Sequence, residues 1–209
     1  MKNYYIKLEF GNYYHIYNRG INGEDLFLIN DNFVHFFRLY EKYIDPIAET
    51  YAWVLMKNHF HFLVRLKEIH EISLKELPDP VRVSNPDRVQ GLKEPHLYFS
   101  HLFNAYTQAF NKKHRRHGSL FERPFKRLLI DNEKYLKNLV VYIHQNPVYH
   151  GFVDHILDYP WSSYLTLVSV KPTKLSRKTV LGWFDDVGNF RETHKKELVD
   201  DGLDDYIIE

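Results

Sequence analysis

The chain of 209 residues contains no cysteine. This absence excludes disulfide bonds, thiolate zinc sites and cysteine nucleophiles, so any chemistry must use histidine, carboxylate, amide or hydroxyl groups. The sequence also lacks a run of eighteen apolar residues, and residues 1–7 have neither the apolar stretch nor the cleavage site of a signal peptide. We therefore expect a soluble, cytoplasmic protein with no membrane partner.

A strong net charge is also missing, because 28 Lys and Arg are almost balanced by 27 Asp and Glu. The charge is nevertheless uneven: residues 112–127 hold seven basic side chains and one carboxylate, and the sequence after residue 185 is mainly acidic. Basic residues interleaved with Phe110, Phe121 and Phe125 suit a single-stranded nucleic acid, since cations hold phosphates and rings stack bases. A solvated helix face is the alternative interpretation. The candidate DNA-binding residues are Arg19, Lys112, Lys113, Arg115, Arg116, Arg123, Lys126 and Arg127.

The spacing of apolar residues predicts an α+β fold. We expect strands at 14–19, 49–56, 59–66 and 125–130, and helices from Asp31 to 44, at 97–118 and at 133–146. The last helix should start at an Asp131 or Asn132 cap and end before Pro147, because proline disfavours helical geometry in the preceding residue. The first six elements, in the order β-α-β-β-α-β, form the split βαβ arrangement of ferredoxin-like and RRM-like folds. In it, two helices cover one face of an antiparallel sheet.

The remaining segments extend this core. The helix at 133–146 is an addition that we expect on the other face of the sheet, beside the candidate site. Residues 67–95, which are rich in proline, should form a long loop. We expect a domain at residues 1–168 and, at 169–209, a small helical appendage with an acidic tail.

His59 and His61 alternate with Phe60 and Phe62 in the strand predicted at 59–66. Side chains in a strand alternate between two faces, so the two imidazoles should lie on one face and the phenyl rings in a core on the other. Two neighbouring imidazoles can share a divalent cation. A pair of structural histidines is the alternative, which this short motif does not exclude.

Tyr142 and Asn146 are four residues apart in the last predicted helix and therefore project from the same side. A phenol can attack phosphorus when a metal ion polarises the phosphate, and the covalent phosphotyrosine conserves the energy of the phosphodiester bond. Two imidazoles and the Asn146 carbonyl suit Mg²⁺ or Mn²⁺, with positions left for phosphate oxygens. The alternative for Tyr142 is a ring that packs against the sheet.

Five blocks of the sequence resemble the single-tyrosine HUH transposases, and most closely the branch associated with repetitive extragenic palindromes (REP). The blocks are 17–20 (YNRG), 52–64 (AWVLMKNHFHFLV), 118–126 (GSLFERPFK), 142–148 (YIHQNPV) and 161–164 (WSSY). They occur in the family's order and span residues 13–165. The region after residue 170 resembles the family only loosely.

The resemblance implies a metal-dependent endonuclease and strand transferase that acts on single-stranded DNA, often at a hairpin, through a 5′-phosphotyrosine. By position, it implies that His59 and His61 are metal ligands and Tyr142 is the nucleophile. Asn146 matches the third ligand, although Gln145 is an adjacent donor that fills this role in some relatives. His144 is predicted to face solvent. Family members work as monomers or as homodimers, and the sequence does not distinguish the two.

A non-catalytic binder of single-stranded nucleic acid, either a domesticated transposase or an RRM-like module, is the main alternative, because a ferredoxin-like sheet with exposed aromatic rings also describes RNA-binding modules. Other metal enzymes fit less well, since the sequence has no His-Glu-x-x-His motif and no Cys pair. The transposase hypothesis places the protein in the cytoplasm, associated with the nucleoid.

Overall fold

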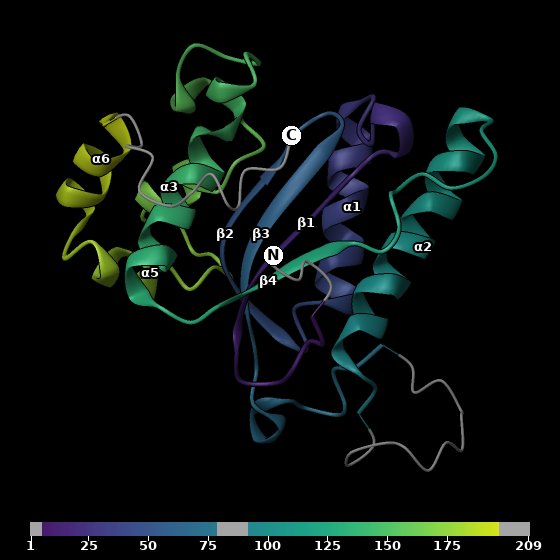
Figure 1. The fold of residues 1–209 in the computed structure, drawn as a ribbon, viewed down its shortest axis with the longest axis horizontal. Helices are drawn as coiled ribbons and strands as arrows, with labels where there is room; N and C mark the ends of the chain where they lie inside the picture. The colour runs from purple at the N-terminus through teal and green to yellow at the C-terminus, as the bar shows by residue number, and fades with distance from the viewer. Residues whose placement is uncertain (1–5, 79–91, 197–209) are drawn as a thin grey trace.

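A four-stranded antiparallel sheet forms the centre of the computed structural model, which describes residues 6–78 and 92–196. The strands lie side by side in the order β2-β3-β1-β4 (Figure 1). They are β1 (Tyr13–Arg19), β2 (Ala48–Leu55), β3 (His59–Leu66) and β4 (Lys126–Ile130). The α-helices are α1 (Asn30–Tyr43), α2 (Pro95–His114), α3 (Glu133–Tyr149), α4 (Tyr164–Val168), α5 (Arg177–Trp183) and α6 (Val187–Lys195). Short 3₁₀ helices span Ile21–Gly23, Ile69–Glu71 and Ile156–Asp158.

One face of the sheet is covered by α1 and α2, as Figure 1 shows. Alternate residues of the strands point to this face, among them Ile16, Phe60 and Phe62, and pack against Phe36 of α1 and Tyr106 of α2. Such aromatic side chains each bury a large apolar area, so this layer contributes strongly to stability. The predicted ferredoxin-like sheet, with Phe60 and Phe62 in the core, is confirmed.

The opposite face is covered by α3, which packs on β2 and β3 together with the C-terminal helices. The exposed edge of β2 is closed by hydrogen bonds from later segments: the N–H of Ser163 donates to the carbonyl of Trp53, and that of Ser176 to the carbonyl of Thr50. Closing an edge strand in this way prevents pairing with other chains. Residues on both sides of the predicted boundary at 168 share one core, and the boundary itself stays a prediction.

Helix α3 continues past Pro147 to Tyr149, so the prediction that it ends at residue 146 was wrong. The proline lies in the last turn, where only one intrahelical hydrogen bond is lost, and the N–H groups of His150 and Phe152 cap the carbonyls of Asn146 and Pro147. At the start of the helix, Asn132 is the cap, as predicted, and its side chain accepts from the N–H of Tyr135 at 2.8 Å.

Two other predicted boundaries also differ. Helix α2 ends at His114 rather than near 118, because Arg115 has a left-handed backbone with φ of 52°. Helix α1 starts at Asn30, and Asp31 lies in its first turn instead of capping it.

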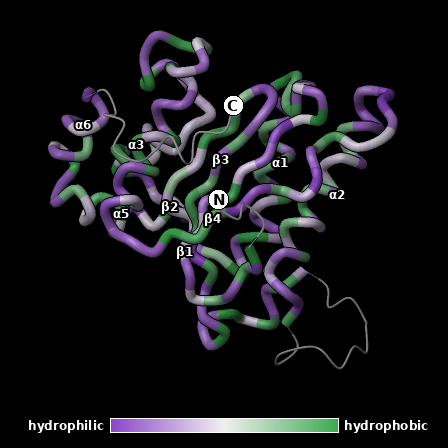
Figure 2. The backbone as a smooth tube through the Cα atoms, in the orientation of Figure 1, coloured by the Kyte–Doolittle hydropathy of each residue, from purple (hydrophilic) through white to green (hydrophobic). Residues whose placement is uncertain are grey.

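Figure 2 shows hydrophilic residues at the outer end of α2, where the basic segment begins. Residues 79–91 of the long loop predicted at 67–95 lie outside the described residues. None of the described helices is long and apolar enough to cross a membrane.

His144 is fully buried, so the prediction that it faces solvent was wrong. Its Nδ1 lies 2.8 Å from Nε2 of His194 on α6, and its Nε2 lies 2.7 Å from Oγ of Ser163. His194 Nδ1 lies 2.7 Å from the carbonyl of Phe190, which only accepts, so this nitrogen carries the proton. Nε2 of His194 must then accept, so Nδ1 of His144 donates to it. Nε2 of His144 in turn accepts from the hydroxyl of Ser163. Every ring nitrogen is satisfied only while both imidazoles are neutral.

Because His144 and His194 are buried as neutral rings, we predict that acid destabilises the fold. Burial lowers the pKa of His194 to about 4 and that of His144 well below its usual range. The unfolded chain therefore binds more protons than the native chain below pH 6.5, so the free energy of unfolding falls as pH drops from about 6.5 towards 4. Replacing His194 with Leu removes one such group and should flatten the slope between pH 6 and 5 by roughly 1 kcal/mol per unit. Urea unfolding at a series of pH values measures it.

The control is His155→Ala, because His155 is exposed. It should reproduce the wild-type slope. An unchanged slope in the His194→Leu variant would show that this pair does not set the acid sensitivity.

Candidate active site

Helix α3 crosses the first residues of β3 and brings together side chains that are more than eighty positions apart in sequence. The ring of Tyr142 meets that of His61 edge-on, with centroids 5.5 Å apart. Asn146 Oδ1 lies 3.2 Å from His59 Nε2. His59, His61, Tyr142 and Asn146, the four residues that the sequence singles out, therefore lie at one place between α3 and the sheet.

His59 lies between two carbonyl oxygens. Its Nδ1 is 2.7 Å from Oδ1 of Asn58, and its Nε2 faces Oδ1 of Asn146. Burial lowers the pKa of His59 to about 4, so the ring is neutral at pH 7 and has one proton to donate. With that proton on Nδ1, the side of the shorter contact, a lone pair on Nε2 faces a lone pair on Asn146 Oδ1.

A cation between these two atoms would remove the conflict. Two ligand atoms at right angles on a divalent ion, each about 2.1 Å from it, are about 3 Å apart, close to the observed 3.2 Å. In the amide orientation of this structure, the donor set therefore fits a divalent cation. Within residues 6–78 and 92–196, no three His, Asp or Glu side chains converge on a common point. A cation site here would accordingly depend on the amide of Asn146.

His61 is held from the side by His15 of β1, whose Nε2 lies 2.9 Å from His61 Nδ1. The two strands are antiparallel, and the register that pairs Tyr17 with His61 also places the Tyr17 ring against the imidazole, with centroids 5.5 Å apart. This leaves Nε2 of His61 for a ligand. Partners of this kind fix the tautomer and orientation of a ligating histidine. Burial lowers the pKa of His61 well below its usual range and that of His15 to about 3, so both rings are neutral.

Tyr142 is only 3% exposed. Burial raises the pKa of its phenol, which the side-chain amide of Asn146 partly opposes. The ring also contacts His15 edge-on, with centroids 6.3 Å apart. The ring thus contacts two imidazoles and is almost entirely enclosed.

A small cavity of about 110 Å³ opens beside the two histidines of β3. Arg19, Lys126 and His150 line it, together with Glu122, whose carboxylate accepts from Arg19 Nε at 2.6 Å. The Lys126 ammonium lies 5.8 Å from the centre of the Tyr17 ring, within range of a cation–π contact. Two of the predicted DNA-binding cations therefore border the candidate site.

Sequence reasoning missed His15, Tyr17 and His150. His15 and Tyr17 alternate along β1 and share its α3-facing side, which was a readable signal, but the register that aligns them with His61 was not. His150 caps the end of α3, and its ring is edge-on to that of His59 with centroids 4.7 Å apart. It was hidden by the prediction that the helix ends at 146.

Gln145, the alternative third ligand, points away from the site. Its Nε2 donates to the carbonyls of His194 and Lys196, both at 3.0 Å, and its Oε1 accepts from the hydroxyl of Tyr149. Neighbouring residues of a helix diverge by about 100°, which explains why Asn146 reaches His59 while Gln145 holds the C-terminal segment.

The predicted basic block does not form one surface. Lys113 pairs with Asp31 at 2.8 Å, and Arg116 pairs with Glu24. Lys112 and Arg115 are exposed at the end of α2. Arg123, in the segment before β4, and Arg127, on β4, line a cavity next to α2, and Lys126 lines the small cavity. Phe110, Phe121 and Phe125, which the sequence offered as rings that stack bases, are buried in the core, because the apolar face of the sheet packs against them.

The fold is similar to that of a REP-associated tyrosine transposase. A solved structure of such a transposase, bound to a REP hairpin, superposes with a TM-score of 0.54 and 21% identity, covering 82% of this chain and 87% of that chain. The resemblance seen in the sequence is thereby confirmed for the fold.

A curated relative from Haemophilus influenzae, provisionally assigned as a REP-associated tyrosine transposase, is 30% identical over 118 residues. The match covers 56% of this chain and 58% of the relative. No family model matches the chain. A bacterial tRNA(His) guanylyltransferase-like protein in complex with GTP superposes with a TM-score of only 0.38 and 12% identity over 68% of this chain and 65% of that one, too low to carry an argument.

The adjacent residues Asn146 and Gln145 give a matched test of the cation site. Asn146→Ala removes the oxygen that faces His59 and should weaken Mn²⁺ binding about tenfold or more, as measured by isothermal titration calorimetry. Gln145→Ala removes an amide that points to the C-terminal segment and should leave the affinity within about twofold. Equal effects of the two variants would show that Asn146 is not a ligand.

Proposed function

We propose that the chain is a single-tyrosine transposase that cleaves and rejoins single-stranded or hairpin DNA with a divalent metal ion. One observation carries the proposal: α3 places Tyr142 and Asn146 against His59 and His61, from segments that are distant in sequence. The transposase names of the similar proteins, and the hairpin bound in the solved structure, support it. Such an enzyme would act on chromosomal DNA in the cytoplasm.

His59, His61 and Asn146 would hold the ion, which we expect to be Mg²⁺ or Mn²⁺. When bound, it would supply the positive charge that polarises the scissile phosphate. His15 would act on the site through His61. If Nε2 of His61 holds the ion, Nδ1 carries the ring proton, and Nε2 of His15, 2.9 Å away, would accept the hydrogen bond from it. Since burial keeps His59 and His61 neutral at pH 7, they can act as ligands without first losing a proton.

The Tyr142 hydroxyl would act as the nucleophile. Its oxygen attacks the phosphorus and loses its proton, the bond from phosphorus to the 3′ oxygen breaks, and that oxygen leaves as a free 3′-hydroxyl once it is protonated. The 5′ end stays on Tyr142 as a phosphodiester. Attack by a 3′-hydroxyl on this phosphotyrosine reverses the step and joins the strands, so no energy source is needed.

One observation favours a second candidate, a non-catalytic binder of single-stranded nucleic acid. Tyr142 is enclosed, and its raised pKa disfavours the phenolate. In a binder of this kind, Tyr142 would serve as a packed ring between α3 and the imidazoles. The two candidates differ in whether the phenol oxygen is needed.

Replacing Tyr142 with Phe removes only that oxygen. Cleavage of end-labelled single-stranded hairpins from the source genome, with Mn²⁺, should fall by about 10⁴-fold or more, while hairpin affinity stays within about twofold of wild type. Tyr135→Phe, two turns earlier on α3, is the matched control and should cleave normally. Cleavage that survives in Tyr142→Phe would assign the nucleophile to another group.

The exposed cations at the end of α2 should contact phosphates rather than bases. The double variant Lys112→Ala/Arg115→Ala should lower affinity for every DNA sequence alike and flatten the slope of log affinity against log salt by about 1.4, or 0.7 for each contact with a single strand. Salt titrations on a hairpin and on a scrambled strand measure this. Lys171→Ala/Lys178→Ala, in exposed positions elsewhere, is the control. A slope equal to that of the control would exclude DNA contact at this surface.

A further inference from the structure

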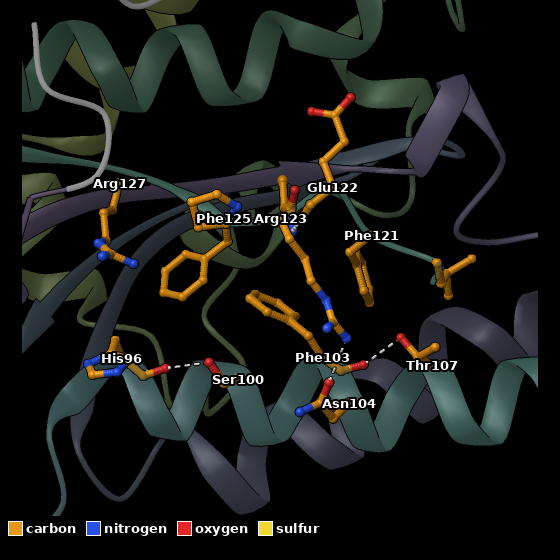
Figure 3. Close-up of a pocket in the computed structure, with 13 residues that line it drawn as sticks. His96, Ser100, Phe103, Asn104, Thr107, Phe121, Glu122, Arg123, Phe125 and Arg127 are labelled. Atoms are coloured by element: carbon orange, nitrogen blue, oxygen red, sulfur yellow. Dashed lines mark hydrogen bonds between the residues drawn. The ribbon is translucent and has the colours of Figure 1, made fainter. Parts of the chain in front are cut away.

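A pocket of about 510 Å³ lies between α2 and the segment before β4 (Figure 3). This volume is within the range of small-molecule sites. The residues that matter here are Phe103, Asn104, Phe121, Arg123, Phe125 and Arg127. We propose that this pocket, which we call the α2 pocket, binds one unpaired nucleobase of the DNA strand that passes the α3 site. The inference rests on the proposed function and adds a specificity site to it.

The α2 pocket adjoins the cavity beside His59 and His61. Asn18 and Glu122 line both, and they are tied together because Asn18 Nδ2 donates to the carbonyl of Glu122 at 3.1 Å. Asn18 points to the α1/α2 side of the sheet and Tyr17 to the α3 side, since neighbouring residues of β1 alternate. Asn18 and Glu122, near the end of β1, therefore separate the two cavities. A DNA strand held beside Tyr142, His59 and His61 can turn around Glu122 and place its next base in the α2 pocket.

The lining of the α2 pocket suits a flat ring with polar edges. Its apolar wall consists of Phe103, Phe121 and Phe125. The Phe103 ring centroid lies 5.1 Å from that of Phe121 and 5.4 Å from that of Phe125. The opening carries the Asn104 amide and the Arg123 guanidinium, which offer donors and an acceptor to base edges. Unpaired bases are bound in this way, by aromatic or guanidinium planes with hydrogen bonds to their edges.

An entering base can displace the Arg123 side chain from its present contact. Figure 3 shows its side chain reaching from the segment before β4 towards Asn104 on α2. The bond between Arg123 Nη2 and Asn104 Oδ1 is 3.3 Å long, at the weak end of the range for hydrogen bonds. Asn104 is exposed, so little is lost when this contact breaks. A base that enters would then stack on, or bond to, the released guanidinium.

Electrostatics favour the α2 pocket over a larger cavity elsewhere on the described part of the chain. Arg123 and Arg127 contribute positive charge, and the single carboxylate of the lining, Glu122, is paired with Arg19. A larger cavity, of about 950 Å³ at the β2 side, is lined by four carboxylates, at positions 41, 45, 49 and 76, and by two lysines. A phosphate backbone is attracted to the first pocket and repelled by the second.

Removal of single bases tests the proposal. Wild-type protein in EDTA, which prevents metal-dependent cleavage, is titrated with hairpins whose flanks carry an abasic site at each position in turn. Loss of the base that fills the α2 pocket should weaken binding roughly five- to hundredfold at one position. The variants Asn104→Ala and Arg123→Lys, the second of which keeps the charge, should bind the intact hairpin less tightly than wild type does. The abasic site at that position should then weaken their binding only slightly further. Gln108→Ala, one turn from Asn104 and exposed, is the control and should behave as wild type.

The outcomes separate this proposal from the function on which it rests. Cleavage of the intact hairpin with Mn²⁺ is measured in parallel. Suppose that cleavage is normal and that each abasic site weakens binding equally in Asn104→Ala and in wild type. The nucleobase pocket would then be rejected, while the proposed nuclease function would stand. An Asn104-dependent position without any cleavage would support the pocket and reject the nuclease. Failure to bind any hairpin would reject both.

Discussion

The antiparallel pairing of β1 with β3 is the interaction on which the candidate site depends. It sets Tyr17 opposite His61 and brings His15 to within 2.9 Å of the same imidazole. Because side chains alternate along a strand, the same register sends Ile16 and Phe62 into the core on the other face. A shift of one residue would exchange the two faces and bury aliphatic groups where the imidazoles now lie. The packing that stabilises the sheet therefore also fixes the polar site.

Charge is divided between the interior and the surface in a way that suits a site for an anionic substrate. Of the imidazoles under α3, His15 and His61 are buried and His59 is half-buried, and all three are neutral, so they offer lone pairs rather than positive charge. Positive charge is supplied at the rim by Arg19 and Lys126. Neutral donors can bind a cation, while the rim attracts phosphates. Acid would protonate the interior groups and weaken both the fold and the donor set.

The sequence predicted the sheet, the helices and the shared face of His59 and His61, because period-two and helical patterns in β3, α1 and α3 are strong and local. It also named Tyr142 and Asn146, which share one side of a helix. It did not predict His15 or His150 at the site, since strand register and a helix that continues past Pro147 depend on tertiary contacts. The burial of His144 by α6 and of three phenylalanines by the core was missed for the same reason: charge and ring content are read from sequence, whereas burial is set by packing.

If α3 presents Tyr142 as the nucleophile at the imidazole site on the sheet, the reaction leaves DNA covalently bound to its hydroxyl. The most direct measurement is peptide mapping by mass spectrometry after wild-type protein has reacted with a hairpin and Mn²⁺ and the complex has been digested by protease and nuclease. We predict a single peptide from α3 that carries a nucleotide 5′-phosphate on Tyr142. An adduct on another residue, or cleavage products without any adduct, would contradict the account.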